Sequence, residues 1–180
     1  MTRLIAVAAS LALTLAGCAS MQPAPSDLTA TAELRDANGQ PAGMATLTQV
    51  GGGSVRIVID AKGMPPGPHG VHVHAVGKCE GPQFTSAGAH FNPDGKQHGT
   101  QNPQGAHAGD LPNLTIDANG TGRLETTTER ITLGTGATSV FDADGSAIIV
   151  HAGPDDFKTD PTGNAGARIA CGVLVKTPVR

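Results

Sequence analysis

Short runs rich in β-branched and aliphatic residues recur along the chain, and polar turns containing Gly, Pro and Asp separate them. Runs of this length between turn residues are typical of β-strands that pack around one core. The pattern predicts eight strands, at residues 28–34, 44–50, 54–60, 71–76, 113–117, 122–127, 146–152 and 168–175. No internal repeat interrupts them, so we expect a single all-β domain over residues 28–180.

Two connections between the predicted strands are long. Residues 77–112 contain three histidines and Asp110, and residues 153–167 read GPDDFKTDPTGNAGA. Long ordered loops in a small β domain are usually functional. Because these two contain little that is apolar, we expect a metal or a disulfide to order them.

The composition narrows the class of protein. The chain has 180 residues, with 25 Gly, 13 Pro, four Phe and no Trp or Tyr, so the core must be built from Val, Ile, Leu and Ala. The formal net charge is −3, and no basic patch with interleaved aromatic residues is present. Nucleic acid is therefore not an expected partner.

The N-terminus has the features of an export signal. Arg3 precedes an apolar run at residues 4–17, which is too short for a comfortable transmembrane helix. The run ends in LAGC at 15–18, which resembles the lipobox of bacterial lipoprotein signal peptides. That resemblance implies cleavage before Cys18 and a lipid on its thiol. The alternative is an ordinary secretory signal followed by a chance cysteine.

The segment after the apolar run reads as a tether. We expect residues 1–17 to be the signal peptide and residues 18–27 to be the lipidated cysteine and a flexible, proline-containing linker. Ala19 follows the cysteine, where an aspartate would indicate retention in the inner membrane. The expected location is the periplasm or cell envelope, with the lipid anchored in the outer membrane.

Two cysteines remain after the signal, Cys79 and Cys171. An exported chain with two remaining cysteines most simply joins them in one disulfide, which would close a loop of about 90 residues. The alternative is a pair of buried free thiols.

The stretch HGVHVH at residues 69–74 holds three of the seven histidines. If residues 71–76 form a strand, alternation places His72 and His74 on one face, while Val71 and Val73 face a core. Two imidazoles on one face make a pair of metal ligands, whereas His69 points to the opposite face of an extended chain. A polar outer face that carries two histidines by chance is the alternative for this stretch alone.

The other histidines strengthen the metal-site interpretation. His90, His98 and His107 share one Gly- and Pro-containing loop with Asp110, so these four side chains can converge. Three imidazoles and one carboxylate form a closed tetrahedral set that is typical of structural zinc. His151 ends the β-branched run SAIIVH, where an imidazole needs a partner or the sheet surface.

Four segments carry a resemblance to a known family: HGVHVHAVGKC at 69–79, SAGAHFNPDGKQHG at 86–99, HAGDLPNL at 107–114 and GNAGARIACGV at 163–173. Over residues 28–177 the chain resembles the copper/zinc superoxide dismutases of the bacterial periplasmic type. The resemblance implies an antiparallel Greek-key β-barrel or sandwich, immunoglobulin-like, with eight strands and two long functional loops.

The resemblance also implies one copper and one zinc per subunit. The implied copper ligands are His72, His74, His90 and His151, and the implied zinc ligands are His90, His98, His107 and Asp110. His90 would bridge the two metals.

Further residues take implied roles by the same resemblance. Asp155 would hydrogen-bond a ligand of each metal, His72 and His98, and His69 would support the copper strand without binding metal. Arg168 would guide the anion to the copper, and Cys79 and Cys171 would form the family's disulfide.

The implied activity is conversion of superoxide to dioxygen and hydrogen peroxide by cycling copper between Cu(II) and Cu(I), with Arg168 and His90 as catalytic residues. We expect such an enzyme to protect the cell envelope from superoxide. It would touch a membrane only through the lipid on Cys18, and the family allows a homodimer. A metal buffer or carrier, or a dismutase-like domain kept for interaction only, are the alternatives.

Overall fold

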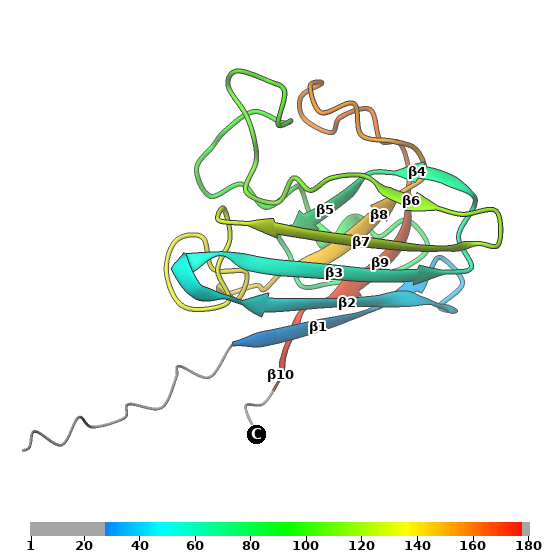
Figure 1. The fold of residues 1–180 in the computed structure, drawn as a ribbon, viewed down its shortest axis with the longest axis horizontal. Coiled ribbons are helices and arrows are strands. Elements are labelled where there is room, and N and C mark those ends of the chain that lie inside the picture. The colour runs from blue at the N-terminus through cyan, green and yellow to red at the C-terminus, as the bar shows by residue number, and fades with distance from the viewer. Residues whose placement is uncertain (1–27, 178–180) are drawn as a thin grey trace, which may run out of the picture.

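The computed structural model describes residues 28–177 and shows an all-β domain (Figure 1). All eight predicted runs form strands, and two short strands add to them. The elements are β1 (Thr29–Asp36), β2 (Pro41–Gln49), η1 (Gly51–Gly53), β3 (Val55–Lys62), β4 (Gly67–His69), β5 (Val71–His74), η2 (Thr85–Ala87), β6 (Leu114–Ile116), β7 (Thr121–Thr128), β8 (Ala147–His151), β9 (Arg168–Val173) and β10 (Val175–Thr177).

The two extra strands have simple causes. β4 is a three-residue strand next to a proline-rich turn, too short to show alternation, and it pairs with β6. The last predicted run splits into β9 and β10, because it leaves β8 and then pairs with the start of β1.

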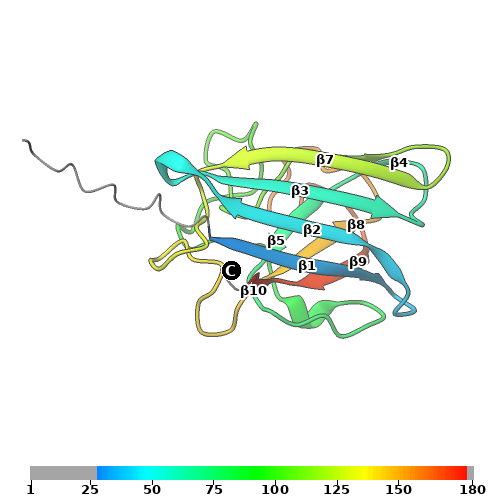
Figure 2. The same cartoon turned by 60° about the horizontal axis from the view of Figure 1, so that its bottom comes forward.

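The sheet is antiparallel and nearly closed. Its strand order is β4-β6-β7-β3-β2-β1-β9-β8-β5, with β10 attached to β1. Strands distant in sequence are neighbours at β3·β7 and β1·β9, as in a Greek key. Only Gly70 separates β4 from β5, so the two ends of this path meet and the sheet curls into a barrel (Figure 2). The predicted Greek-key β-barrel is confirmed.

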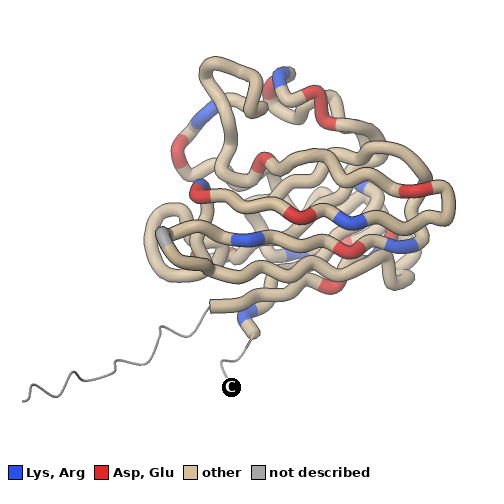
Figure 3. Tube along the Cα trace, in the orientation of Figure 1, with Lys and Arg blue, Asp and Glu red and all other residues tan. Residues whose placement is uncertain are grey.

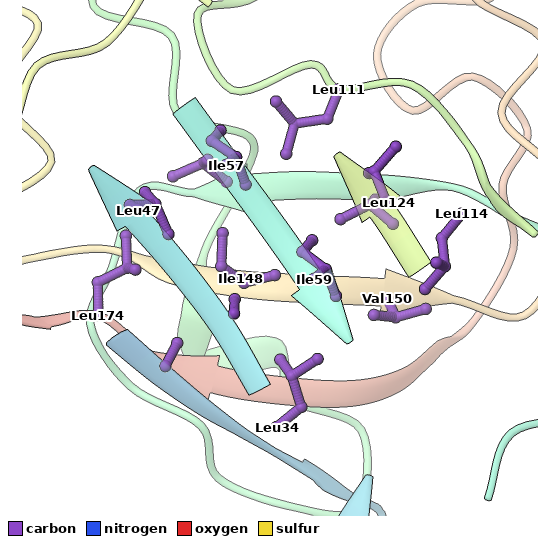
Figure 4. Close-up of a cluster of buried hydrophobic side chains, with 14 of the residues drawn as sticks. Leu34, Leu47, Ile57, Ile59, Leu111, Leu114, Leu124, Ile148, Val150 and Leu174 are labelled. Atoms are coloured by element: carbon purple, nitrogen blue, oxygen red, sulfur yellow. The ribbon is translucent and has the colours of Figure 1, made fainter. Parts of the chain in front are cut away.

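Aliphatic side chains fill the barrel. The labelled side chains in Figure 4 project into one interior from the strands and, for Leu111 and Leu174, from the segments beside them. All are buried: Leu34, Leu47, Ile57, Ile59, Leu111, Leu114, Leu124, Ile148, Val150 and Leu174. Burial of each such side chain contributes about 1.5–3 kcal/mol. Aliphatic side chains therefore build most of this core, and Phe91 is the one aromatic residue among its buried members in residues 28–177.

Charged side chains occupy the outer face of β3 and β7, where blue and red alternate along the tube (Figure 3). Arg56 pairs with Glu125 at 2.6 Å, and Arg123 pairs with Asp60 at 2.6 Å, in each case across the two strands. Exposed pairs of this kind add at most about 1 kcal/mol each. Their position shows that the barrel wall presents a polar face outside and an apolar face inside.

The two predicted long loops lie together at one end of the barrel, above β5 and β8 in Figure 1. The first, residues 75–113, returns alongside β5, because Phe91 N donates to Val73 O at 2.8 Å and Val73 N donates to Gly109 O at 2.9 Å. A side chain at Gly109 would collide with the backbone oxygen of Val73, so only glycine permits this approach. The loop is thus held flat against the strand that carries two histidines.

The predicted disulfide is present. Cys79 and Cys171 are bonded with a Cα–Cα distance of 5.6 Å, and the bond joins the first long loop to β9. Within residues 28–177, no helix is long and apolar enough to cross a membrane.

Candidate metal centre

The barrel supplies three histidines from two paired strands. His72 and His74 lie on β5, and His151 is the last residue of β8, the strand that pairs with β5. Val71 and Val73 alternate with the first two and enter the core. Although they face away from that core, His72 and His74 are both 0% exposed, and each contacts a residue of a long loop: Asp155 for His72 and Gly88 for His74.

Four imidazoles converge on one point. The ligand atoms of His72, His74, His90 and His151 all lie within 4.8 Å of one another. Each contributes one buried nitrogen that makes no hydrogen bond with any described residue: His72 Nδ1, His74 Nε2, His90 Nε2 and His151 Nε2. An unsatisfied buried nitrogen costs about 1–3 kcal/mol, so four of them facing one point fit a metal ion.

A second set of donors surrounds the carboxylate of Asp110. Its Oδ1 lies 3.1 Å from His90 Nδ1, 3.1 Å from His98 Nδ1 and 3.3 Å from His107 Nδ1. Four tetrahedral ligands about 2.0–2.1 Å from a zinc ion are separated from one another by roughly 3.3–3.4 Å. These spacings, and the 3.3 Å between the Nδ1 atoms of His90 and His107, therefore fit a zinc ion.

The second cluster of ligand atoms that lie close to one another differs from the expected zinc ligands in one residue. The four atoms within 4.8 Å of one another include His72 and leave out His107. His72 also belongs to the four-histidine set, so its ring is close to both. The contacts of His107 with Asp110 and His90 nevertheless place it at the second set.

In every histidine of the two sets except His90, the ring nitrogen that points away from the set faces an acceptor. His72 Nε2 is 2.7 Å and His98 Nε2 is 2.9 Å from a carboxylate oxygen of Asp155. The remaining acceptors are Gly88 O for His74 at 2.9 Å, Gly166 O for His151 at 3.1 Å and, at a longer 3.8 Å, Asp160 Oδ1 for His107. Such acceptors orient the ring and fix which nitrogen keeps its lone pair for a metal.

His90 is the exception among these histidines. Its Nδ1 faces Asp110 and its Nε2 faces the four-histidine set, so neither nitrogen is directed to an acceptor outside the two sets. An imidazole with both nitrogens engaged in this way can bind two metals at once. The geometry therefore joins the two sets through one ring.

Burial keeps the four-histidine set neutral. Desolvation lowers the pKa of His72 to about 3, that of His74 to about 2 and that of His151 to about 4. At neutral pH these imidazoles carry no proton on the nitrogen that faces the centre, and they can bind a cation without first losing one.

The second set is charged differently. Burial alone would lower the pKa of His98, but its hydrogen bonds with Asp110 and Asp155 outweigh this and raise the pKa to about 9. Burial would also raise the pKa of Asp110, yet its contacts with three histidines hold that pKa well below the ordinary value. Without a metal, this set is thus an ion pair at neutral pH.

Asp155 links the two sets. It is 3% exposed, and its two oxygens contact His72 and His98 respectively. Asn113 holds its backbone from both sides, because the side-chain amide donates to Asp155 O at 3.0 Å and accepts from Asp155 N at 2.9 Å. Sequence reasoning missed Asn113 and Asp160, since both act through contacts between segments far apart in the chain.

Arg168 lines the cavity that reaches the four-histidine set. It begins β9, and its guanidinium donates to Phe84 O and Gly88 O, both at 2.6 Å. It lines a cavity of about 670 Å³ together with His74, His90 and His151. Among the cavities described for residues 28–177, this one alone is lined by histidines of the four-histidine set. A fixed positive charge therefore stands beside them.

His69 does not join either set. Its Nδ1 is 2.7 Å from His151 O and its Nε2 is 2.8 Å from Pro65 O. Both nitrogens face carbonyl oxygens, so neither offers a lone pair to a metal. The residue instead holds the backbone of the strand end that carries His151.

The chain is similar to known proteins over most of its length. The sequence model of the family described as copper/zinc superoxide dismutase (SODC) matches residues 41–174. Superoxide dismutase (Cu-Zn) 2 of Aquifex aeolicus is 47% identical over 150 residues, which cover 82% of this chain and 87% of that protein. The superoxide dismutase (Cu-Zn) of Caulobacter vibrioides is 41% identical over 174 residues, covering 95% of this chain and 99% of the relative.

Solved structures agree with the barrel. A SOD-like protein from Bacillus subtilis superposes with a TM-score of 0.78 at 39% identity, covering 81% of this chain and 97% of that one. A double mutant of the same protein superposes with a TM-score of 0.78 at 41% identity, covering 81% of this chain and 96% of that one.

Zinc binding to the metal-free protein should release a proton at pH 7. His98 has a pKa of about 9 and must lose a proton before its Nδ1 binds a metal. Zinc affinity should therefore rise about tenfold per pH unit up to about pH 9. Calorimetric titration in two buffers of different ionisation enthalpy measures the release, which should be about one proton per zinc. It should decrease in Asp155→Asn, where His98 loses one carboxylate partner; equal heats in both buffers for the unaltered protein would contradict the assignment.

Proposed function

The chain belongs to the copper/zinc superoxide dismutase family, and on that premise we propose which of its residues carry out the dismutation of superoxide. The protein is a superoxide dismutase that uses copper and zinc. The proposed copper ligands are His72, His74, His90 and His151, and the proposed zinc ligands are His90, His98, His107 and Asp110. The observation that carries this assignment is His90, whose two ring nitrogens face the two donor sets.

The donor types suit the two metals. Imidazole binds copper in both oxidation states as well as zinc, and a closed set of three imidazoles and one carboxylate suits zinc. When bound, copper supplies the one-electron chemistry by which one superoxide leaves as dioxygen and a second, with two protons, leaves as hydrogen peroxide, and zinc supplies a fixed positive charge. The residues of the chain bind the metals, orient the ligand rings, carry a proton and guide the substrate.

His90 is the proposed proton carrier. Its Nδ1 stays in the zinc set, next to Asp110 Oδ1, so the ring keeps its position. Its Nε2 lines the cavity and can hold a proton whenever copper does not occupy it. That proton is then within reach of the peroxide product in the same cavity.

Asp155 is the proposed coupling residue. By accepting from His72 Nε2 and His98 Nε2, it leaves Nδ1 of each ring free to face its metal set. Because one carboxylate orients a ligand of each set, a shift at one set is transmitted to the other.

Arg168 is the proposed guide for superoxide. Its charge is permanent, it lies in the cavity that reaches three of the copper ligands, and two carbonyl oxygens hold the guanidinium in place. A small anion that enters the cavity meets this charge beside the histidines. Electrostatic guidance of this kind raises association rates by about 10–1,000-fold, and superoxide dismutase is a known example of it.

The N-terminal segment is the proposed export signal and anchor, and it lies outside the residues that the structure describes. We propose that residues 1–17 are removed, that Cys18 carries the lipid, and that residues 18–27 tether the domain of residues 28–180. The LAGC motif and the apolar run before it support this. The enzyme would then act in the periplasm, bound to the outer membrane, and protect the cell envelope from superoxide.

Replacement of His151 by alanine should lower the dismutation rate by more than about 100-fold while one zinc per chain remains bound. The substitution removes a donor from the copper set and leaves every zinc donor in place. The decay of a superoxide pulse, with a metal count on the same sample, checks this. Two findings would refute the assignment: full turnover in the variant, or a merely stoichiometric reaction in the unaltered protein that carries both metals.

Arg168→Gln should reduce kcat/KM by about 10-fold or more and weaken its dependence on ionic strength, because the guiding charge is lost. Arg168→Lys keeps the charge but not the paired hydrogen bonds, so its kcat/KM should lie between those of Arg168→Gln and the unaltered enzyme. Arg123→Gln, on the outer barrel face, is the matched control and should keep the original rate. Equal salt dependence in Arg168→Gln and the unaltered enzyme would rule out guidance by this residue.

Cys18→Ser should release the full-length protein from membranes into the soluble periplasmic fraction. A lipid on the cysteine thiol is the proposed link to the membrane, and serine cannot take its place in that linkage. Fractionation of cells that express each form measures this, and unchanged membrane retention of Cys18→Ser would disprove the anchor.

A further inference from the structure

Arg130 contacts the second donor set from the side of the barrel. It follows β7 by two residues, and its Nη2 donates to the backbone oxygen of Asp110 at 2.5 Å. The side chain is half-buried, and its Nε is buried and makes no hydrogen bond with residues 28–177. Of the five arginines in that range, Arg35, Arg56 and Arg123 pair with carboxylates, whereas Arg130 binds a carbonyl beside the metal centre.

Asp110 is the residue on which the second set is assembled. Its Oδ1 faces the Nδ1 atoms of all three histidines of that set, while its Oδ2 accepts from the backbone nitrogens of Gly99 at 2.9 Å and His107 at 3.0 Å. A small rotation of the Asp110 backbone would therefore move its carboxylate relative to every other ligand.

Two other contacts hold this part of the loop: Leu111 packs into the core, and the backbone of Asp110 pairs with that of His72 on β5. A cavity of about 340 Å³ lies here, lined by Asp110, Leu111 and Pro112 on one side and by Thr128 and Arg130 on the other. The guanidinium reaches across this space to the Asp110 carbonyl. Its own backbone is fixed, because Arg130 N donates to Thr128 Oγ1 at 3.2 Å at the end of a strand that pairs along its length with β3.

We propose that Arg130 is a positioning residue of the zinc site, which holds the backbone of Asp110 so that its carboxylate stays at zinc-binding distance from the three histidines. The inference rests on the proposed zinc ligands. A hydrogen bond from a charged donor is about twice as strong as a neutral one, and its loss leaves the nearly buried Asp110 carbonyl without this partner. Arg130 thus transmits the rigidity of the barrel to a metal ligand in a loop.

The test compares zinc affinity in Arg130→Met, Arg130→Gln and Arg130→Lys, measured by competition of the metal-free protein with a chelator. Arg130→Met keeps an apolar stem but no donor, and it should bind zinc about 10–100-fold more weakly. Arg130→Lys keeps a charged donor and should recover most of the affinity, with Arg130→Gln between them. The absorption spectrum of bound Co(II) should shift in Arg130→Met and not in Arg130→Lys, because it reports the ligand geometry. Arg123→Gln is the control and should match the unaltered protein.

The outcomes separate this inference from the metal assignment. If the unaltered protein binds no zinc, the proposed zinc ligands are wrong and this role of Arg130 falls with them. If it binds zinc and Arg130→Met has equal affinity and an equal Co(II) spectrum, even with a lower melting temperature, Arg130 is merely structural and the inference is wrong. Should Arg130→Met fail to fold, Arg130→Gln decides: weaker zinc binding than in Arg130→Lys supports the role, and affinity equal to that of the unaltered protein overturns it.

Discussion

The position of the His90 ring is the constraint on which the metal centre depends. The ring comes from a loop, yet one of its nitrogens completes a set built on the barrel strands and the other completes a set built within the loop itself. Both nitrogens must therefore be held at once. Several buried ring nitrogens around this position make no hydrogen bond with the described residues, at a cost of about 1–3 kcal/mol each, so a metal that bound them would also stabilise the loops.

The remainder of the structure keeps that ring and its neighbours in place. β8 and β5 are the last two strands in the order of a nearly closed sheet, and together they offer three histidines from one paired wall. The first loop lies along β5 by backbone hydrogen bonds, and the Cys79–Cys171 disulfide fastens it to β9. The carbonyl of Gly88, which accepts from both His74 and Arg168, connects a proposed copper ligand to the proposed guide for superoxide. A small number of backbone hydrogen bonds and one disulfide thus connect the barrel to the candidate metal ligands.

Much of this could be predicted from the sequence because the signals are local. Alternation along VHVH separates His72 and His74 from two core valines without any structural knowledge. Turn residues mark the ends of all eight main strands, and the expectation of export predicts that the two cysteines after Cys18 pair, as they do. What could not be predicted depends on contacts between segments far apart in the chain. Asn113, Asp160 and Arg130 act on backbone groups of distant loops, and their residue types and spacing carry no signal for that.

The most direct measurement of the central claim is the electron paramagnetic resonance spectrum of the enzyme with Cu(II) in the copper set and either zinc or Co(II) in the zinc set. If His90 bridges the two sites, its imidazolate couples the unpaired electrons of the two ions. The Cu(II) signal seen with zinc should then be lost or strongly broadened when Co(II) replaces zinc at one ion per chain. An unchanged Cu(II) spectrum, with both ions bound stoichiometrically, would contradict a shared ligand and with it this account of the metal centre.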